Sequence, residues 1–290
     1  MKRVILFVLT NLAVVVTINI LLSVLSALGV LPRFDQGSLT GLMAFCFLWG
    51  MVGSFISLQM SRFMAKRAMG LRLIDGNTGN ADLDRVYNTI GHLTQQAGLP
   101  MPEVGVYDSP EVNAFATGPS QSRSLVAVST GLLRQMDQAA VQGVLGHEIT
   151  HIKNGDMVTM ALLQGVINSF VMFFAHIIAS VLFPSDRENR RPSFLYYIAL
   201  NVIQMALSAL GAIVVCWFSR QREFRADAGG AELAGRVSMI GALKSLLANQ
   251  DRVDNSQQAL TTFKIAGGPM ALFATHPPLE VRIARLEGRA

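Results

Sequence analysis

Charged side chains are scarce in this 290-residue chain, and their scarcity limits what the protein can be. Lys, Arg, Asp and Glu make up 15% of it, whereas 51% is hydrophobic and the mean hydropathy is +0.41. A soluble globular domain carries about 25% charged residues. The composition therefore excludes an ordinary soluble domain and favours a membrane protein.

The sequence also lacks a basic stretch interleaved with aromatic side chains, which is typical of nucleic-acid-binding proteins. Its pI of about 9.6 nevertheless reflects an excess of positive charge. Positive residues flank the apolar runs described below, in the positive-inside pattern of membrane proteins: Lys2, Arg3, Arg62, Lys66, Arg67, Arg220, Arg222 and Arg225. We therefore expect a lipid bilayer, and no nucleic acid, as a partner.

Lys, Arg, Asp and Glu are absent from four long apolar runs, at residues 4–31, 41–60, 157–183 and 194–218. Each run is long enough to cross a bilayer as a helix, which takes about 20 residues. Buried helices of a soluble protein are the alternative, but four such runs exceed what one core needs. The first run is too long for a signal peptide, whose apolar part has about 7–15 residues, so we expect a retained anchor. Cys46 and Cys216 fall inside these runs and are interpreted as small hydrophobic residues.

The charge pattern predicts two membrane hairpins, at residues 1–60 and 157–218. The polar stretches 61–156 and 219–290 would then lie together in the cytoplasm. The short connection 184–193 contains three arginines, which argues against an outside position for it. Either this loop lies outside despite its charge, or the third and fourth runs form a hairpin that does not fully cross. Both alternatives return the chain to the side that it left.

Secondary structure in the polar stretches is indicated by periodicity and by turn residues. Apolar spacing predicts helices over residues 82–97, 137–153, 238–250 and 279–286, and short strands over 104–107 and 125–129. Asp137 can cap the second of these helices, and Asn154-Gly155 can end it. The expected fold is a mainly α membrane protein with four hydrophobic helices and a cytoplasmic α+β domain that contains a small β-sheet.

The most informative motif is His147-Glu148-Ile149-Thr150-His151, in a chain with only five histidines. Residues four apart on a helix lie on the same face, so His147 and His151 can bind one metal ion. Neutral imidazoles with a carboxylate suit Zn²⁺ and leave a position for water. Glu148 would lie beside that water as its general base. An exposed amphipathic helix with inert histidines is the alternative.

A zinc site needs a third protein ligand, and Glu223 is the best candidate. It lies five residues after the fourth apolar run, and His151 lies six residues before the third, so a returning hairpin brings both to one side of the membrane. Asp227 shares a helix face with Glu223 and can hydrogen-bond the free nitrogen of a ligand histidine. A solvated charged helix face is the alternative for this segment.

Four segments together resemble the HtpX-type membrane zinc metalloproteases, in the family that includes the CAAX prenyl proteases. They are V-N-A-F-A-T-G (112–118), G-H-E-I-T-H-I-K-N-G-D (146–156), S-R-Q-R-E-F-R-A-D (219–227) and T-H-P-P-L-E-V-R-I (275–283). The resemblance covers nearly the whole chain and implies a gluzincin-like catalytic domain with one Zn²⁺ per subunit. It implies His147, His151 and Glu223 as ligands and Glu148 as the base.

Further roles are implied by the resemblance alone. His276 and Arg282 would lie near the metal and could stabilise the oxyanion; a helix-entry histidine and a solvated arginine are the alternative. Residues 112–117 would form a strand along which an extended substrate binds, with a plain loop as the alternative. The substrate-binding residues would be Asn113, Ala114, Phe115 and Ala116.

The expected function is hydrolysis of peptide bonds in misfolded or damaged membrane proteins, at the cytoplasmic face of the bacterial inner membrane. The nature of these substrates comes from the resemblance only. A narrow-specificity processing protease, like the CAAX prenyl proteases, is the close alternative. An intramembrane site-2-type protease would place the histidine motif inside an apolar run, and a scaffold with a decayed site would not retain all four metal-site residues.

Overall fold

The structure is a computed structural model that describes residues 39–183, 194–254 and 274–289. The predicted helix at 4–31 and the connection at 184–193 lie outside these residues. The chain forms two compact units. One comprises Leu58–Met160 and Val215–Ala290, and the other comprises Met1–Ser57 and Ala161–Val214.

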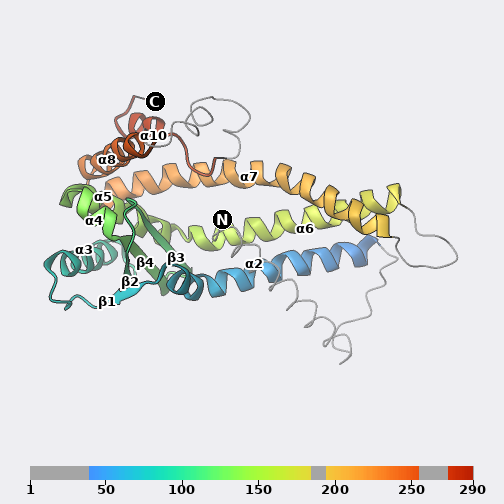
Figure 1. The fold of residues 1–290 in the computed structure, drawn as a ribbon, viewed down its shortest axis with the longest axis horizontal. Helices are drawn as coiled ribbons and strands as arrows, with labels where there is room; N and C mark the ends of the chain where they lie inside the picture. Colours follow the sequence, from blue (N-terminus) through green and yellow to red (C-terminus); the bar gives the residue numbers. More distant parts are fainter. Residues whose placement is uncertain (1–38, 184–193, 255–273, 290) are drawn as a thin grey trace. The chain divides into compact units, whose positions relative to one another are not determined.

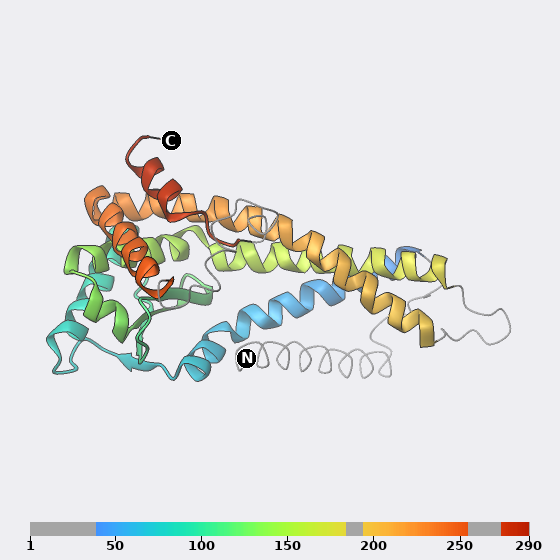
Figure 2. The ribbon, with the colours of Figure 1, turned by 45° about the horizontal axis from the view of Figure 1, so that its top comes forward.

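Among the described residues, three helices are long and apolar enough to cross a membrane: α2 (Leu39–Met69), α6 (Asp156–Leu182) and α7 (Phe194–Ala234). They are the long blue, yellow-green and orange helices of Figures 1 and 2. The most apolar stretch of α7 is not buried within the protein at all. Such a large exposed apolar surface is untenable in water, which supports a bilayer as its environment and argues against a soluble core.

Small residues allow close helix contacts within the unit that contains most of the apolar segments. Gly50 of α2 lies against α6, where a Cβ on this glycine would come within 2.6 Å of the Gly165 carbonyl oxygen. A Cβ on Gly211 of α7 would likewise come within 2.6 Å of Cγ2 of Ile167 on α6. Close backbone approach at small residues is typical of helix packing in membranes.

The predicted helix ends at residues 60 and 218 are wrong. Helix α2 continues to Met69 and α7 continues to Ala234, so both extend well beyond their apolar runs. Loss of hydrophobicity marks where a helix leaves the bilayer, but polar residues such as Arg and Gln still favour helix. In α2 the polar extension is anchored, because Arg62 and Lys66 both form ion pairs with Glu103.

A four-stranded sheet lies in the other unit, in the order β1-β2-β4-β3. Its strands are β1 (Arg72–Ile74), β2 (Glu103–Tyr107), β3 (Ala114–Ser120) and β4 (Arg123–Ser129). Strands β2 and β4 are parallel, and the other two pairs are antiparallel. Among the described strands β3 pairs with β4 alone, so it is an edge strand.

Helices α3 (Ala81–Ala97) and α5 (Gln138–Asn154) pack on one face of this sheet (Figure 1). The shared core contains Val86 and Ile90 of α3, Val126 of β4, and Leu145 and Ile149 of α5. The core side chains of α3 and α5 recur at helical spacing, and the side chain from β4 belongs to the apolar segment from which that strand was predicted. The predictions of both helices and of strands β2 and β4 are confirmed, whereas β1 and the short α4 (Thr130–Gln135) were not predicted.

Helix α5 has defined ends, and two further helices pack beside it. Asp137 caps α5 by accepting a hydrogen bond from the Ala140 amide at 2.7 Å. Gly155 ends α5 in the left-handed conformation at φ 65°, which favours glycine. Helix α8 (Arg236–Asp254) packs against α5, and α10 (Leu279–Leu286) packs against α8. Both lie close to their predicted positions.

Candidate metal centre

Helix α5 places His147 and His151 on one buried face. The two imidazoles meet nearly at right angles, with their Nε2 atoms 3.1 Å apart. Glu148 lies beside them and is half-buried, and its charge acts on both imidazoles. The arrangement follows from the four-residue spacing, which turns both rings toward the same point.

Glu223 of α7 reaches the same point from another part of the chain. Its Oε2 lies 3.4 Å from Nε2 of His147, and its Oε1 lies 3.4 Å from Nε2 of His151. The side chain is only 1% exposed. Glycine makes this approach possible, since a Cβ on Gly230 would lie 3.0 Å from the backbone nitrogen of His147. The three predicted metal ligands therefore converge within one buried cluster.

A carboxylate lies behind each histidine. Asp227 lies one turn beyond Glu223 on α7, and its Oδ1 is 3.0 Å from Nδ1 of His147. Asp156, the first residue of α6, has its Oδ2 2.6 Å from Nδ1 of His151. The sequence analysis assigned no role to Asp156. The signal was present, because a carboxylate directly follows the glycine that ends the histidine helix.

Two residues near the C-terminus complete the cluster. Arg282 of α10 is buried, and its Nε and Nη2 donate to both carboxylate oxygens of Asp227, at 2.8 and 2.6 Å. The Nδ1 atom of His276 lies 3.0 Å from Oε2 of Glu223, although 61% of the His276 side chain is exposed. The other carboxylate oxygen of Glu223, Oε1, lies 3.2 Å from Nη2 of Arg222.

The electrostatics of the cluster favour positive charge at the histidines. Burial alone would lower the pKa of His147, but its hydrogen bonds with Asp227 and Glu223 outweigh burial and raise the pKa to about 9. Burial also opposes the charged form of His151, and its hydrogen bonds with Asp156 and Glu223 again raise the pKa. The carboxylates thus create a site that attracts a cation.

The donor set fits a metal ion. One ligand atom from each of His147, His151 and Glu223 lies within 4.8 Å of the others. Metal binding requires neutral imidazoles, so a bound ion would replace the protons that the carboxylates otherwise hold on His147 and His151. With both imidazoles neutral, the carboxylates of Glu148, Asp156, Glu223 and Asp227 exceed the guanidiniums of Arg222 and Arg282 by two charges. A divalent cation would balance this excess. Three protein ligands would leave a position for water or substrate, as in catalytic sites.

The predicted substrate-binding residues lie at the edge strand β3, which contacts α5. Ala114, Phe115 and Ala116 pair with Val128, Ala127 and Val126 of β4. Asn113 directly precedes the strand, and its carbonyl accepts a hydrogen bond from the Ser129 amide at 2.9 Å. Alternation in an antiparallel ladder then turns the backbone N–H and C=O groups of Ala114 and Ala116 away from β4.

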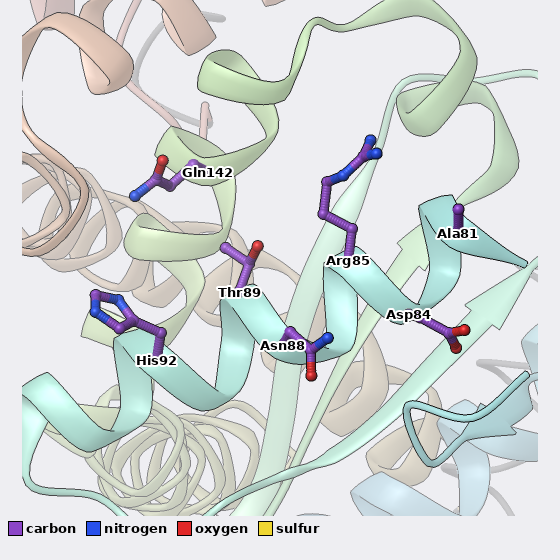
Figure 3. A pocket seen from close by; sticks show the side chains of 7 residues that line it. All are labelled: Ala81, Asp84, Arg85, Asn88, Thr89, His92 and Gln142. Atoms are coloured by element: carbon purple, nitrogen blue, oxygen red, sulfur yellow. The ribbon is translucent and has the colours of Figure 1, made fainter.

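The described part of this unit also has two hollows that are lined by none of the three candidate metal ligands. The first, of about 490 Å³, lies between α3 and α5 (Figure 3), where Arg85, Asn88 and His92 of α3 and Gln142 of α5 form polar walls. None of the predicted site residues lines it. The second, of about 290 Å³, lies between α7 and α10, and Asp227 and Arg282 are among the residues that line it.

Comparisons with known proteins agree with this geometry. A sequence model of peptidase family M48 matches residues 80–290. The chain is 48% identical over 297 residues to a Protease HtpX homolog of Bacillus pumilus, and the alignment covers 99% of both chains. It is 46% identical over 292 residues to Protease HtpX of Idiomarina loihiensis, with 100% of both chains covered.

The fold has a solved counterpart in the crystal structure of S. mikatae Ste24p. The two structures match with a TM-score of 0.62 and 17% sequence identity, over 99% of this chain and 67% of that one. At this identity the likeness concerns the fold alone. The family match and the full-length relatives lead to a firmer conclusion: the chain belongs to peptidase family M48 and is a membrane metalloprotease.

Proposed function

We propose that this protein is a membrane-anchored zinc endopeptidase with one Zn²⁺ per subunit, held by His147, His151 and Glu223. The observation that carries the proposal is the convergence of these three donors, at separations of 3.1, 3.4 and 3.4 Å. Ligands about 2.0–2.2 Å from a tetrahedral zinc ion lie roughly 3.3–3.6 Å from one another. The donor spacing therefore supports zinc, as does the pairing of two imidazoles with one carboxylate.

Glu148 is the proposed general base. When bound, Zn²⁺ supplies Lewis acidity that polarises the scissile carbonyl and acidifies the attacking water. Glu148 takes a proton from that water and later passes it to the leaving amine. Its position on α5 between the two histidines supports this role, because its carboxylate is half-buried and is not a member of the ligand set.

Asp227 is the proposed orienting partner of His147. A carboxylate on Nδ1 holds that nitrogen in its protonated form and leaves Nε2 free to bind the metal. Arg282 in turn fixes Asp227 through its two hydrogen bonds. We propose that Arg282 and His276 also stabilise the negative charge that develops on the substrate oxygen. The exposed side chain of His276, next to Glu223, suits direct contact with substrate.

Strand β3 is the proposed binding site for the substrate backbone. The outward backbone groups of Ala114 and Ala116 can pair with an extended peptide, which would add a strand to the sheet. The edge position of β3 and its contact with the histidine helix support this proposal. Binding through backbone groups would tolerate many substrate sequences, with Asn113 and Phe115 beside the bound chain.

The proposed substrates are misfolded or damaged membrane proteins, and the proposed site of action is the cytoplasmic face of the bacterial inner membrane. The relatives named Protease HtpX support proteolysis, and a substrate strand that binds through backbone groups suits polypeptides of varied sequence. The basic residues that follow the apolar parts of α2 and α7, among them Arg62, Lys66, Arg220 and Arg225, support the proposed site of action. A processing protease with a narrow substrate range is the alternative.

Metal content and hydrolysis, measured together in the full-length protein in detergent, test the proposal. We expect about one zinc per chain and cleavage of an unfolded protein such as casein, both abolished by a chelator and restored by Zn²⁺. Glu223→Ala should lose most of the metal and all of the cleavage. Glu232→Ala, an exposed glutamate on the same helix, is the matched control and should retain both. Full zinc occupancy in Glu223→Ala would disprove the proposed ligand set.

A further inference from the structure

The contact between Asp156 and His151 is the shortest in the metal cluster between a carboxylate and an imidazole, at 2.6 Å. Both side chains are buried. The contact occupies Nδ1 of His151, while Nε2 of the same ring faces Nε2 of His147 and Oε1 of Glu223. One nitrogen of His151 is therefore engaged by Asp156, and the other points at the candidate metal position.

The chain places Asp156 there by a tight turn. Gly155 adopts φ 65°, and its amide bonds back to the carbonyls of His151 and Ile152. Helix α6 begins directly afterwards, at Asp156. Its carboxylate thus lies five residues beyond His151 yet returns to that side chain. The N-terminus of α6 also favours a negative charge at this position.

Burial separates Asp156 from an ordinary acidic residue in a first helical turn. Asp82, in the first turn of α3, has a side chain that is 72% exposed and pairs with Arg85. The Asp156 side chain is only 4% exposed. An exposed carboxylate stabilises a helix N-terminus as well as a buried one does. Burial of a carboxylate costs free energy unless a positively charged partner compensates. Among the described residues, the ionisable side chain in contact with the Asp156 carboxylate is that of His151.

We infer that Asp156 is a positioning residue for metal binding, an inference that rests on the proposed function. It holds Nδ1 of His151 protonated and fixes the ring, so that the Nε2 lone pair faces the metal. Each ligand histidine then has its own carboxylate, Asp227 for His147 and Asp156 for His151, on different helices. The two pairs hold the imidazoles at the 86° angle at which both Nε2 atoms converge.

Zinc affinity tests this inference. Competition with a chromophoric chelator would be measured on the full-length protein in detergent, together with the absorption spectrum of the Co²⁺ form. Loss of a carboxylate that orients a metal-bound histidine weakens metal binding by about 10–100-fold. We expect a loss in this range for Asp156→Ala, with an altered Co²⁺ spectrum. Asp156→Asn keeps an acceptor for Nδ1–H but removes the charge, so its loss should be smaller, about tenfold.

Asp137→Ala is the matched control. This substitution removes the cap of the same helix α5, and we expect a lower melting temperature with unchanged zinc affinity. Wild-type affinity in Asp156→Ala would overturn the inference and leave the proposed function intact. If that variant does not fold, wild-type affinity in Asp156→Asn would overturn it. An equal loss of affinity in Asp137→Ala would also overturn it, and a wild type without tight zinc binding would disprove the proposed function itself.

Discussion

Arg282 holds Asp227 with two hydrogen bonds, from Nε and Nη2 to the two oxygens of one carboxylate. Both side chains are buried, and Asp227 in turn contacts Nδ1 of His147. The flat guanidinium fork matches a carboxylate in a way that an ammonium group does not. Arg282 therefore controls the orientation of His147, a candidate metal ligand far away in the sequence, through its contact with Asp227.

Replacing Arg282 should accordingly impair both stability and metal binding. Arg282→Met leaves the buried Asp227 without its cation, which typically destabilises a protein by about 3–5 kcal/mol. Arg282→Lys keeps the charge but loses the fork, so we expect a smaller loss of stability and reduced zinc affinity. Thermal unfolding and chelator competition would measure the two effects. Arg285→Lys, an exposed position on the same helix where the side chain lies over the Phe224 ring, should be nearly neutral.

Glu148→Gln should separate metal binding from hydrolysis. Glutamine has nearly the same shape but cannot accept a proton, and a general base contributes about 10²–10⁴-fold to a rate. We expect unchanged zinc content and a decrease in kcat of that size, measured with an unfolded protein substrate. Glu280→Gln makes the same change at an exposed position of α10 and should have full activity. Near-normal hydrolysis by Glu148→Gln would assign the base to another residue.

The contact between α5 and α7 should not tolerate even one added methyl group. A Cβ on Gly229 would lie 2.4 Å from Cγ2 of Thr150, which is buried on α5. Gly229→Ala should therefore lower the melting temperature and the zinc affinity, because α7 carries Glu223. Thr150→Ala in the same chain should restore part of both. Gly241→Ala, in open space on α8, should be neutral or slightly stabilising, and an equal loss there would contradict this explanation.

Proline substitutions on β3 should reveal whether substrate pairs with its free edge. The N–H of Ala116 points away from β4, so Ala116→Pro should leave the sheet intact but remove one donor to the substrate. We expect kcat/KM to fall about 2- to 13-fold, because one hydrogen bond is worth about 0.5–1.5 kcal/mol, with little change in melting temperature. Phe115→Pro would instead break the ladder with Ala127 and lower the melting temperature. Unchanged kcat/KM in Ala116→Pro would argue against β-strand addition.

Much of the local structure could be predicted because it depends on short spacings. The helical period identified α3 and α5, and alternation of apolar residues identified β2 and β4. The ends of α2 and α7 could not be predicted in this way. Hydropathy falls where a helix leaves the bilayer, but Arg62 and Arg222 are good helix formers, so the backbone continues unchanged. The short strand β1 has three residues, too few to show a period.

The sequence by itself predicted the pair of histidines and the proposed base between them, because helix geometry converts a four-residue spacing into one shared face. It also indicated the glutamate that could join them. Only the tertiary structure decided which carboxylate serves which histidine. It placed Asp227 on His147 and Asp156 on His151, and it put Arg282 behind Asp227. Those contacts depend on a turn at Gly155, on the close approach of α7 to α5, and on the packing of α10 against α8. Distances between separate helices are not encoded in any local pattern.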